Sequence, residues 1–258
     1  MLLGVNIDHI AVLREARLVN DPSPLDSLLI AKNAGADQIT IHLREDRRHI
    51  HDDDAEDIIR LSSLPVNLEC SINEGIITIV NDLKPFRATL VPENRDEVTT
   101  EGGLDIASNL ERIKEVVKDL NKNEIDVSLF VDPDIKSMEL SAQAGAQMVE
   151  LHTGTYANIY AMLYSNLSQT RYSVKELEKP RSELEKMLEN EVQRLTIAAK
   201  KAHELGLEVA AGHGLNYQNV KAFNSIPHIV ELNIGQSIIA RSVYTGLESA
   251  IREMKSLI

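Results

Sequence analysis

Short apolar runs recur along the chain, and each is followed by a stretch in which apolar residues return with helical spacing. A period of two is typical of strands, and a period near 3.6 is typical of helices. Regular alternation of strand and helix predicts that the strands lie parallel. The predicted strands are Leu2–Asp8, Gln38–Leu43, Val66–Ser71, Ala88–Pro92, Val127–Asp132, Met148–Thr153, Glu208–Gly212 and Ile229–Ile234. The clearest predicted helices are Pro24–Ala34, Asp105–Leu120, Ile135–Ala144 and Gln236–Leu257.

Eight strand–helix units in 258 residues favour an α/β fold of the closed (β/α)₈ type, a TIM barrel, formed as one domain from residue 1 to residue 258. An open doubly wound sheet is the alternative, and it normally has a glycine-rich dinucleotide turn after its first strand. Here that turn reads NIDHIAVLREAR and contains no glycine. Gly35, Gly145 and Gly206 each precede a predicted strand, where glycine can cap the helix in the left-handed conformation.

One segment interrupts the alternation. The connection between the sixth and seventh strands, Tyr156–Leu207, is longer than one connecting helix needs. Its most charged part, Ser173–Arg194, has the pattern of a helix around Pro180. We expect a solvated extra helix that is too short and too polar to have a core of its own. A lid or a subunit contact is the alternative.

Composition narrows the class of protein. The net charge of −13 argues against nucleic acid as the main partner, although a local cleft can still attract anionic metabolites. No apolar run approaches the roughly 20 residues of a membrane span. The N-terminus, MLLGVNIDHI, lacks the basic and long apolar regions of a signal peptide. The single cysteine, Cys70, excludes an internal disulfide, so we expect a cytoplasmic protein.

Basic residues gather in one stretch of this acidic chain. In QITIHLREDRRHIHDDD, which runs from Gln38 to Asp54, three Arg and three His fall within ten residues. Alternation places Thr40, His42 and Arg44 on one face of the strand. The acidic residues at the end of the stretch suit the first turn of a helix. A histidine on the inner face of a strand, followed by a basic loop, predicts a phosphorylated substrate.

Polar residues keep a spacing of two on most of the predicted strands, so on each strand they share a face. In a barrel the active site lies at the carboxyl ends of the strands. Polar inward residues on so many strands favour a catalytic centre over a polar core that is merely satisfied by hydrogen bonds. These residues are Asn6, Asp8, His9, His42, Arg44, Asn67, Glu69, Glu150, His152, His213, Glu231 and Asn233.

Histidine and glutamate together indicate general acid–base catalysis, because imidazole titrates near neutrality and burial raises the pKa of a carboxyl. A metal site is the rival interpretation, since His42, Glu69, Glu150 and His213 are all possible ligands. These strands carry no His-x-His or His-x-x-x-His motif, so we expect no metal. They also carry no lysine, so the amine of any imine must come from a substrate.

Two glycine turns indicate a phosphate site. Gly212–Gly214 follows the seventh strand, and Asn233–Gln236 leads from the eighth strand into the last helix. Barrels often bind phosphate between these loops, on backbone N–H groups at a helix N-terminus. A second anionic group is expected near a set of basic residues that can donate charge-assisted hydrogen bonds. These are Arg17, Arg44, Arg47 and His49.

Longer stretches around these residues resemble the pyridoxine 5′-phosphate synthase family of vitamin B6 biosynthesis. They are GVNIDHIAVLREAR, AGADQITIHLREDRRHI, NLE, LVPENRDEVTTEGGLD, VSLFVD, ELHTGTYA, AGHGLNYQNV and ELNIGQSIIAR, and they cover nearly the whole chain. The resemblance implies a (β/α)₈ barrel that forms a homo-octamer and needs no cofactor. It also implies condensation of 3-amino-2-oxopropyl phosphate with 1-deoxy-D-xylulose 5-phosphate, which gives pyridoxine 5′-phosphate, phosphate and water.

The resemblance also implies roles for individual residues. His42 in IHLRE matches the first acid–base residue and Glu69 in NLE the second, whereas His213 in AGHG matches the proton donor. Glu150 in ELHTG matches the buried carboxylate that supports proton transfer. The residues that match the aminoketone phosphate site are Asn6, Arg17, Gly214, Gly235 and Gln236. Those that match the deoxyxylulose phosphate site are Asp8, His9, Arg44, His49 and Thr99.

The chain departs from the family pattern in two places. Gln236 stands where histidine is common, although its backbone N–H is retained, and Ser173–Arg194 is longer than in many members. Two other classes stay open as alternatives. A non-catalytic phosphometabolite-binding barrel would need the anion sites but not His42, Glu69 or His213. A metal-dependent barrel hydrolase is the third possibility.

Overall fold

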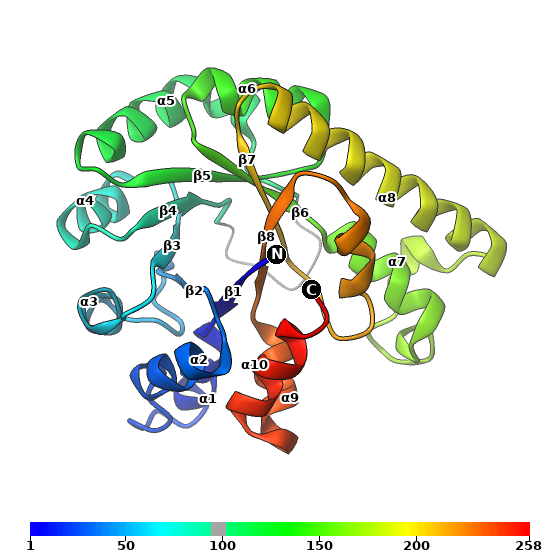
Figure 1. Ribbon diagram of the computed structural model, residues 1–258, viewed down its shortest axis with the longest axis horizontal. Coiled ribbons are helices and arrows are strands. Elements are labelled where there is room, and N and C mark those ends of the chain that lie inside the picture. The colour runs from blue at the N-terminus through cyan, green and yellow to red at the C-terminus, as the bar shows by residue number, and fades with distance from the viewer. Residues whose placement is uncertain (94–101) are drawn as a thin grey trace.

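In the computed structural model, which describes residues 1–93 and 102–258, eight parallel strands form a closed barrel in sequence order. The last strand pairs with the first (Figure 1), and Gly4 lies opposite Asn233. The strands are β1 (Leu2–Asn6), β2 (Gln38–His42), β3 (Val66–Cys70), β4 (Arg87–Leu90), β5 (Asp126–Val131), β6 (Met148–His152), β7 (Glu208–Gly212) and β8 (Ile229–Ile234). The predicted TIM barrel is confirmed, and the open-sheet alternative is wrong.

Helices surround the barrel in Figure 1. The α-helices are α1 (Asp8–Glu15), α2 (Ser27–Ala34), α3 (Asp52–Leu61), α4 (Glu74–Leu83), α5 (Ile106–Lys122), α6 (Ile135–Ala144), α7 (Gly154–Tyr164), α8 (Arg181–Glu204), α9 (Gln236–Thr245) and α10 (Leu247–Lys255). The 3₁₀ helices are η1 (Pro24–Asp26), η2 (Leu167–Gln169), η3 (Lys175–Leu177) and η4 (Val220–Ser225). The ends of the chain meet, since Lys255 Nζ donates a hydrogen bond of 2.9 Å to Met1 O.

Two predicted boundaries are corrected. The first strand was expected to reach Asp8, but Asp8 opens α1, where a carboxylate suits the positive end of a helix. The last helix was expected to run unbroken from Gln236 to Leu257, but Gly246 divides it into α9 and α10. Gly246 has φ 78° and ψ 151°, a conformation that is essentially restricted to glycine.

Alternating side chains divide each strand between two environments. On β2, Ile39 and Ile41 are fully buried on the outer face, where they belong to the large apolar core. Thr40 and His42 are of opposite parity, and the register pairs Thr40 with Asn67 and His42 with Glu69. This register brings an imidazole and a carboxylate to the same end of the barrel.

Polar side chains also fill the barrel near the beginnings of the strands. Arg87 and Glu231, both buried, form an ion pair of 2.9 Å, and Gln38 Nε2 donates to the same carboxylate at 3.1 Å. A buried charge is tolerated only when it is paired and hydrogen-bonded, as both are here. The hydrogen-bonded side chains of Gln38, Arg87 and Glu231 therefore close the barrel below the carboxyl ends of the strands.

The long connection after α7 differs from the expectation. Pro180 precedes α8 instead of lying within a helix, because proline lacks the N–H that a helix interior needs. From there α8 runs without interruption into the layer around the barrel (Figure 1). Its Leu184 and the preceding Leu177 are buried in a second apolar cluster against α7. The segment was expected to be solvated and without a core, and that expectation is wrong for its first turns.

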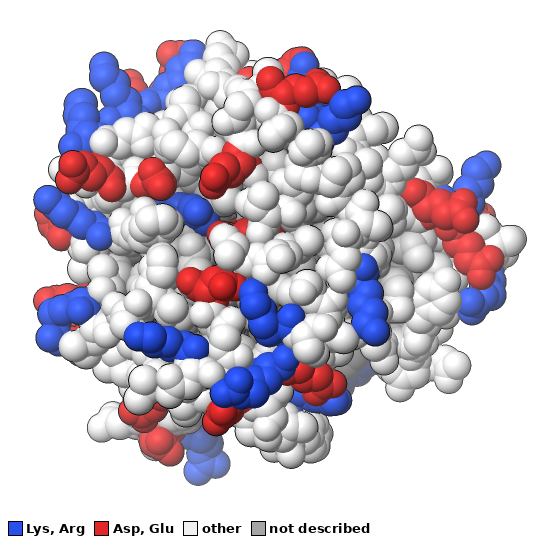
Figure 2. Space-filling model, viewed as in Figure 1, with Lys and Arg blue, Asp and Glu red and all other residues white. Residues whose placement is uncertain are grey.

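Three predicted helix ends are confirmed by left-handed glycines. Gly35, Gly145 and Gly206 have φ values of 100°, 85° and 83°. Figure 2 shows Lys and Arg side chains interspersed with Asp and Glu on the face in view. Within the residues that the structure describes, no helix is both long and apolar enough to cross a membrane.

Candidate active site

A cavity of about 540 Å³ opens at the carboxyl ends of the strands. Side chains from most strands of the barrel reach it, as expected for a TIM-barrel active site. The predicted site residues that line it are Asn6, His9, His42, Glu69, Glu150, His213, Gly214, Gly235 and Gln236. The structure thus brings the four predicted acid–base residues and the two glycine loops to one cavity.

His42 and Glu69 face each other across neighbouring strands. His42 Nδ1 lies 4.0 Å from Glu69 Oε2. Burial, with smaller contributions from the nearby His49 and Arg44, lowers the pKa of His42 to about 3. His42 is therefore a neutral imidazole at pH 7, as a general base must be.

Asp8 supports this pair from α1. Its carboxylate accepts the backbone N–H of His42 at 2.9 Å and the side-chain amide of Asn6 at 2.9 Å. Burial raises the pKa of Asp8 to about 7, although these hydrogen bonds oppose the shift. Asp8 is among the predicted substrate-binding residues, and in this structure its observed contacts hold the end of β2 and Asn6.

Glu150 lies in the centre of the barrel mouth. Asn233 Nδ2 donates to its carboxylate at 2.7 Å. Burial, assisted by the negative charge of Glu231, raises the pKa of Glu150 to about 7. A carboxyl that titrates near neutrality can both take and return a proton at physiological pH.

His213 follows β7 with a left-handed backbone, φ 80°. Desolvation of its ring and the neighbouring His152 together lower the pKa of His213 to about 4, although the residue as a whole is exposed at the mouth. This shift favours the neutral imidazole at pH 7. An anionic substrate beside it would favour the imidazolium form that donates a proton.

The two glycine loops meet at the start of α9. Ser237 Oγ donates to Leu215 O at 2.8 Å, which ties the helix to the loop after β7. Gly214 has φ 79°, and a Cβ there would lie 2.5 Å from Ala157 Cβ. A Cβ on Gly235 would lie 2.8 Å from Asn6 Cβ. Both positions need glycine, and the N-terminus of α9 leaves backbone N–H groups suited to an anion at the cavity.

Two residues expected at the second anion site, Arg44 and His49, lie near His42 but outside the described cavity lining. Arg44 is 1% exposed, with Nε 3.2 Å from Asp46 Oδ1 and 3.8 Å from Glu93 Oε1. The rings of His49 and His42 lie 6.2 Å apart, and burial lowers the pKa of His49 to about 4. Neither Arg44 nor His49 is among the described residues that line the cavity.

Two other predicted residues, Arg17 and Arg47, lie away from the described cavity lining, and the placement of Thr99 stays a prediction. Arg17 is exposed in the turn after α1 and is missing from the described lining of the cavity. Arg47 pairs with Asp52 at 2.9 Å on the loop before α3. Thr99 lies outside the residues that the structure describes.

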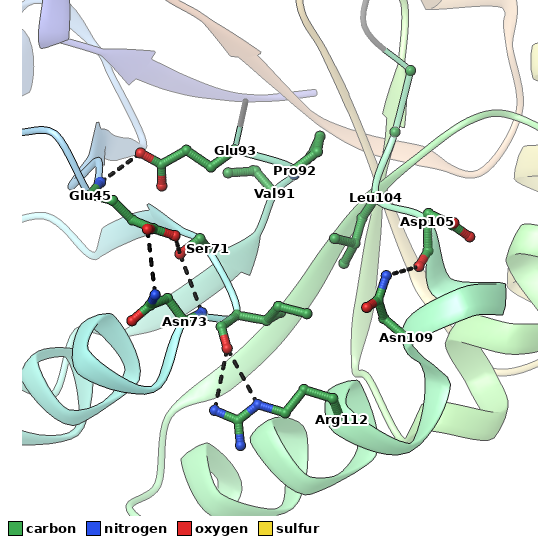
Figure 3. A pocket seen from close by; sticks show the side chains of 13 residues that line it. Glu45, Ser71, Asn73, Val91, Pro92, Glu93, Leu104, Asp105, Asn109 and Arg112 are labelled. Atoms are coloured by element: carbon green, nitrogen blue, oxygen red, sulfur yellow. Dashed lines mark hydrogen bonds between the residues drawn. The ribbon is translucent and has the colours of Figure 1, made fainter. Parts of the chain in front are cut away.

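A neighbouring hollow of about 740 Å³ shares Val91, Pro92 and Gly102 with the cavity. Figure 3 shows its acidic side, where Glu93 accepts the backbone N–H of Glu45 at 2.6 Å. The Glu45 carboxylate in turn accepts hydrogen bonds from the side chains of Ser71 and Asn73 (Figure 3). Because the hollow borders the ends of the undescribed range 94–101, we assign no ligand to it.

Sequence reasoning missed several lining residues. Phe130, Asn216 and Ser237 line the cavity but were not predicted. Phe130 has the inward parity of the strand VSLFVD, so alternation could have indicated it. Asn216 and Ser237 lie beyond strand ends, where no periodic signal exists. Over residues 1–93 and 102–258, no group of three or more His, Cys, Asp and Glu is arranged to hold a metal.

Comparison with known proteins identifies the family. A model of the family described as "Pyridoxal phosphate biosynthesis protein PdxJ" matches residues 3–258. The chain belongs to the PdxJ family. Its relatives include proteins named pyridoxine 5′-phosphate synthase from Aliarcobacter butzleri, 66% identical over all of this chain and 99% of that one, and from Wolinella succinogenes, 58% identical over all of this chain and 98% of that one.

Solved structures show the same fold at much lower identity. Phosphoribosyl anthranilate isomerase from Thermus thermophilus has a TM-score of 0.56 and 14% identity, over all of this chain and 98% of that one. The tryptophan synthase α-subunit from Pyrococcus furiosus has a TM-score of 0.58 and 11% identity, over 99% of this chain and 97% of that one. For this PdxJ-family chain these likenesses establish the barrel alone.

Proposed function

We propose that this PdxJ-family chain is a pyridoxine 5′-phosphate synthase. It condenses 3-amino-2-oxopropyl phosphate with 1-deoxy-D-xylulose 5-phosphate, giving pyridoxine 5′-phosphate, phosphate and water. The observation that carries the proposal is the convergence of His42, Glu69, Glu150 and His213 on one cavity beside two glycine loops. The names of its relatives, at 58–66% identity over the full chain, support the same reaction.

The acid–base chemistry is divided among four side chains. His42 and Glu69, side by side on β2 and β3, take and return protons at the carbon atoms that form the ring. Glu150, whose pKa lies near 7, supports these transfers from the barrel centre. His213 donates a proton to a leaving group. The amine of the imine comes from the aminoketone, because the barrel strands carry no lysine.

The two phosphates occupy opposite sides of the mouth. The aminoketone phosphate binds on the β7–β8 side, at Asn6, Gly214, Gly235 and Gln236, where helix α9 begins. The residues proposed for the deoxyxylulose phosphate are Asp8, His9, Arg44 and His49, together with Thr99, which lies outside the described residues. Arg17 is carried over from the family resemblance to the aminoketone site.

Further parts of the proposal rest on the resemblance and on composition. We place the reaction in the cytoplasm, in a homo-octamer of single-domain chains spanning residues 1–258. We expect neither metal nor organic cofactor to take part, and neither nucleic acid nor membrane to be a partner. The single Cys70 supports the cytoplasmic location, and the net charge of −13 supports the absence of a nucleic-acid partner.

Product formation tests the reaction directly. Purified protein is incubated with both phosphorylated substrates, and pyridoxine 5′-phosphate is measured by chromatography and mass. His42→Asn and Glu69→Gln should each lower kcat roughly 10²–10⁴-fold, because each removes a proton-transfer group. Binding of both substrates without product would instead indicate the non-catalytic barrel. Wild-type turnover in either variant would remove that residue from the mechanism.

A further inference from the structure

The corner His152–Gly154 joins β6 to α7 beside His213, and the family resemblance gives it no role. β6 and β7 are neighbours in the barrel (Figure 1), and His152 lies opposite Gly212. We propose that this corner positions His213. The His152 ring packs against the His213 ring, Thr153 holds the His213 backbone, and Asp132 orients His152. The inference deepens the proposed function, because it takes His213 as the proton donor.

The His152 ring forms a wall against the His213 ring. Their centroids lie 5.2 Å apart with the planes at 66°, an edge-to-face arrangement. Phe130 closes the same side, at 5.1 Å from the His152 ring and 6.3 Å from the His213 ring. His152 is only 4% exposed, so it is itself held by close packing. The His213 ring therefore has a fixed surface on the side away from solvent.

Asp132, directly after β5, sets the orientation of His152. Its Oδ1 lies 3.2 Å from His152 Nδ1, and its carboxylate also accepts the backbone N–H of Gly103. A carboxylate can only accept, so Nδ1 carries the hydrogen and the ring cannot flip without losing this bond. The other nitrogen, Nε2, is buried without a hydrogen-bond partner among the described residues.

Gly154 leaves the space that both rings use. A Cβ on Gly154 would lie 2.5 Å from His152 Nε2 and 3.3 Å from His213 Cδ2. The first distance is below any normal contact, so a side chain here would force the rings to move. The glycine is required by this close approach of the helix start to two imidazoles.

Thr153 holds the backbone of His213 in an uncommon conformation. His213 has φ 80°, and non-glycine residues rarely adopt the left-handed region unless the surroundings hold them there. The buried Thr153 hydroxyl lies 2.7 Å from Gly212 O and 2.5 Å from His213 O. The Thr153 N–H donates to Gly212 O at 2.9 Å. These bonds span the residue whose side chain enters the cavity.

The corner itself is not part of the described cavity lining, so its loss should affect turnover and not substrate binding. A misplacement of about 1 Å in a catalytic group can cost about 10²-fold in rate. Two variants of His152 distinguish the packing of its ring against His213 from its hydrogen bond to Asp132. His152→Asn keeps a donor toward Asp132 but removes the ring, whereas His152→Phe keeps a ring but removes the donor.

We expect His152→Asn to lower kcat roughly 10–100-fold with KM for both substrates within about threefold. His152→Phe should recover most of this loss, which a purely hydrogen-bonding role would not allow. Thr153→Val, which keeps the shape and removes the hydroxyl, should also lower kcat with KM retained. Thr196→Val is the control, because it removes a 2.8 Å hydrogen bond to Val192 O within α8, away from the mouth of the barrel, and should leave kcat within about twofold.

A double-mutant cycle decides whether the corner acts through His213. In a His213→Asn background, His152→Asn or Thr153→Val should cost no further activity, since the group they position is gone. The inference would be overturned if the activity losses of the two substitutions multiply, or if His152→Asn is more active than His152→Phe. In either case, product formation by the wild type would still support the proposed synthase. No product from wild type would overturn both. If His152→Asn does not fold, the Thr153→Val cycle gives the same decision.

Discussion

At the scale of single residues, burial sets the protonation states of the site. Burial is the largest cause of the raised pKa values of Asp8 and Glu150 and of the lowered values of His42 and His213. A dry site disfavours charge on acids and bases alike. The imidazoles of His42 and His213 are therefore neutral at pH 7, and in the proposed reaction the two phosphorylated substrates bring most of the charge with them.

Glu150 allows a test of this point through stability. The pKa of its carboxyl is about 7 in the folded chain against 4.5 without burial, so between these values the folded state binds one more proton than the unfolded state. Rising pH must then lower the free energy of unfolding through this window, and the loss is complete above pH 7. Glu150→Gln removes the titrating group.

The variant should therefore gain stability relative to wild type when pH rises from 5.5 to 8.5, by on the order of 1–2 kcal/mol. Urea unfolding at fixed protein concentration at the two pH values measures the gain. The same difference between variant and wild type at both values would show that the folded Glu150 does not titrate near neutrality.

At the scale of elements, the two proposed phosphate sites use different kinds of group. On the β7–β8 side, backbone groups at Gly214, Gly235 and the start of α9 face the cavity. On the β2 side, the support is a side chain, Arg44, anchored between Asp46 and Glu93. A helix N-terminus and a guanidinium both stabilise phosphate. Phosphate binding by the backbone is weakened by an added side chain, whereas binding by Arg44 is lost when the guanidinium is removed.

Gly235→Ala and Arg44→Gln should thus affect different substrates. The added Cβ of Gly235→Ala presses on Asn6, so the aminoketone phosphate should bind at least tenfold more weakly while the deoxyxylulose phosphate changes little. Arg44→Gln should show the reverse. Calorimetric titration of each substrate into each variant measures both, and equal losses throughout would mean that the two sites are not divided in this way.

The start of α8 is a packed element. Leu184 is 4% exposed and lies in one cluster with Leu177, Ile159, Met162 and Leu163. Leu184→Ala should lower the free energy of unfolding by about 2–3 kcal/mol, because buried leucine truncations leave a cavity. The exposed Glu189→Ala on the same helix should stay within about 0.5 kcal/mol. Urea unfolding of both variants compares them, and an equal, small effect would restore the solvated-helix interpretation.

At the scale of the whole molecule, barrel closure gathers chemistry from distant parts of the sequence. His42 and His213 belong to opposite halves of the chain, yet both line one cavity because β8 pairs with β1. Beneath them the buried ion pair of Arg87 and Glu231 closes the barrel. The assembled site brings together carboxyl groups, imidazoles and a helix N-terminus, the groups that the proposed condensation by proton transfer requires.

Turnover should therefore persist without metal. Protein treated exhaustively with a chelator and then dialysed should keep its kcat within about twofold, because His42, Glu69, Glu150 and His213 supply the proton transfers. Product formation before and after treatment is the measurement. Loss of activity that a divalent ion restores would favour the metal-dependent alternative.

The sequence by itself determined the fold and most of the strand ends. Period-two alternation marks each short strand, and the carboxyl ends of the strands of a parallel barrel all lie at its mouth. His42, Glu69, Glu150 and His213 could therefore be predicted to lie at the same end of the barrel. The glycine stops at Gly35, Gly145 and Gly206 followed from local conformational preference, which needs no distant partner.

Only the tertiary structure decided which polar residues reach the cavity and which support them. Arg44 and His49 are set behind His42, and Arg17 is exposed, although all three carry the same charge-based signal in the sequence. The His152–His213 contact joins the ends of two strands that are far apart in the chain, and the burial of Leu184 depends on how α8 packs against α7. Such contacts depend on how closed strands and their helices pack, and no local periodicity encodes that packing.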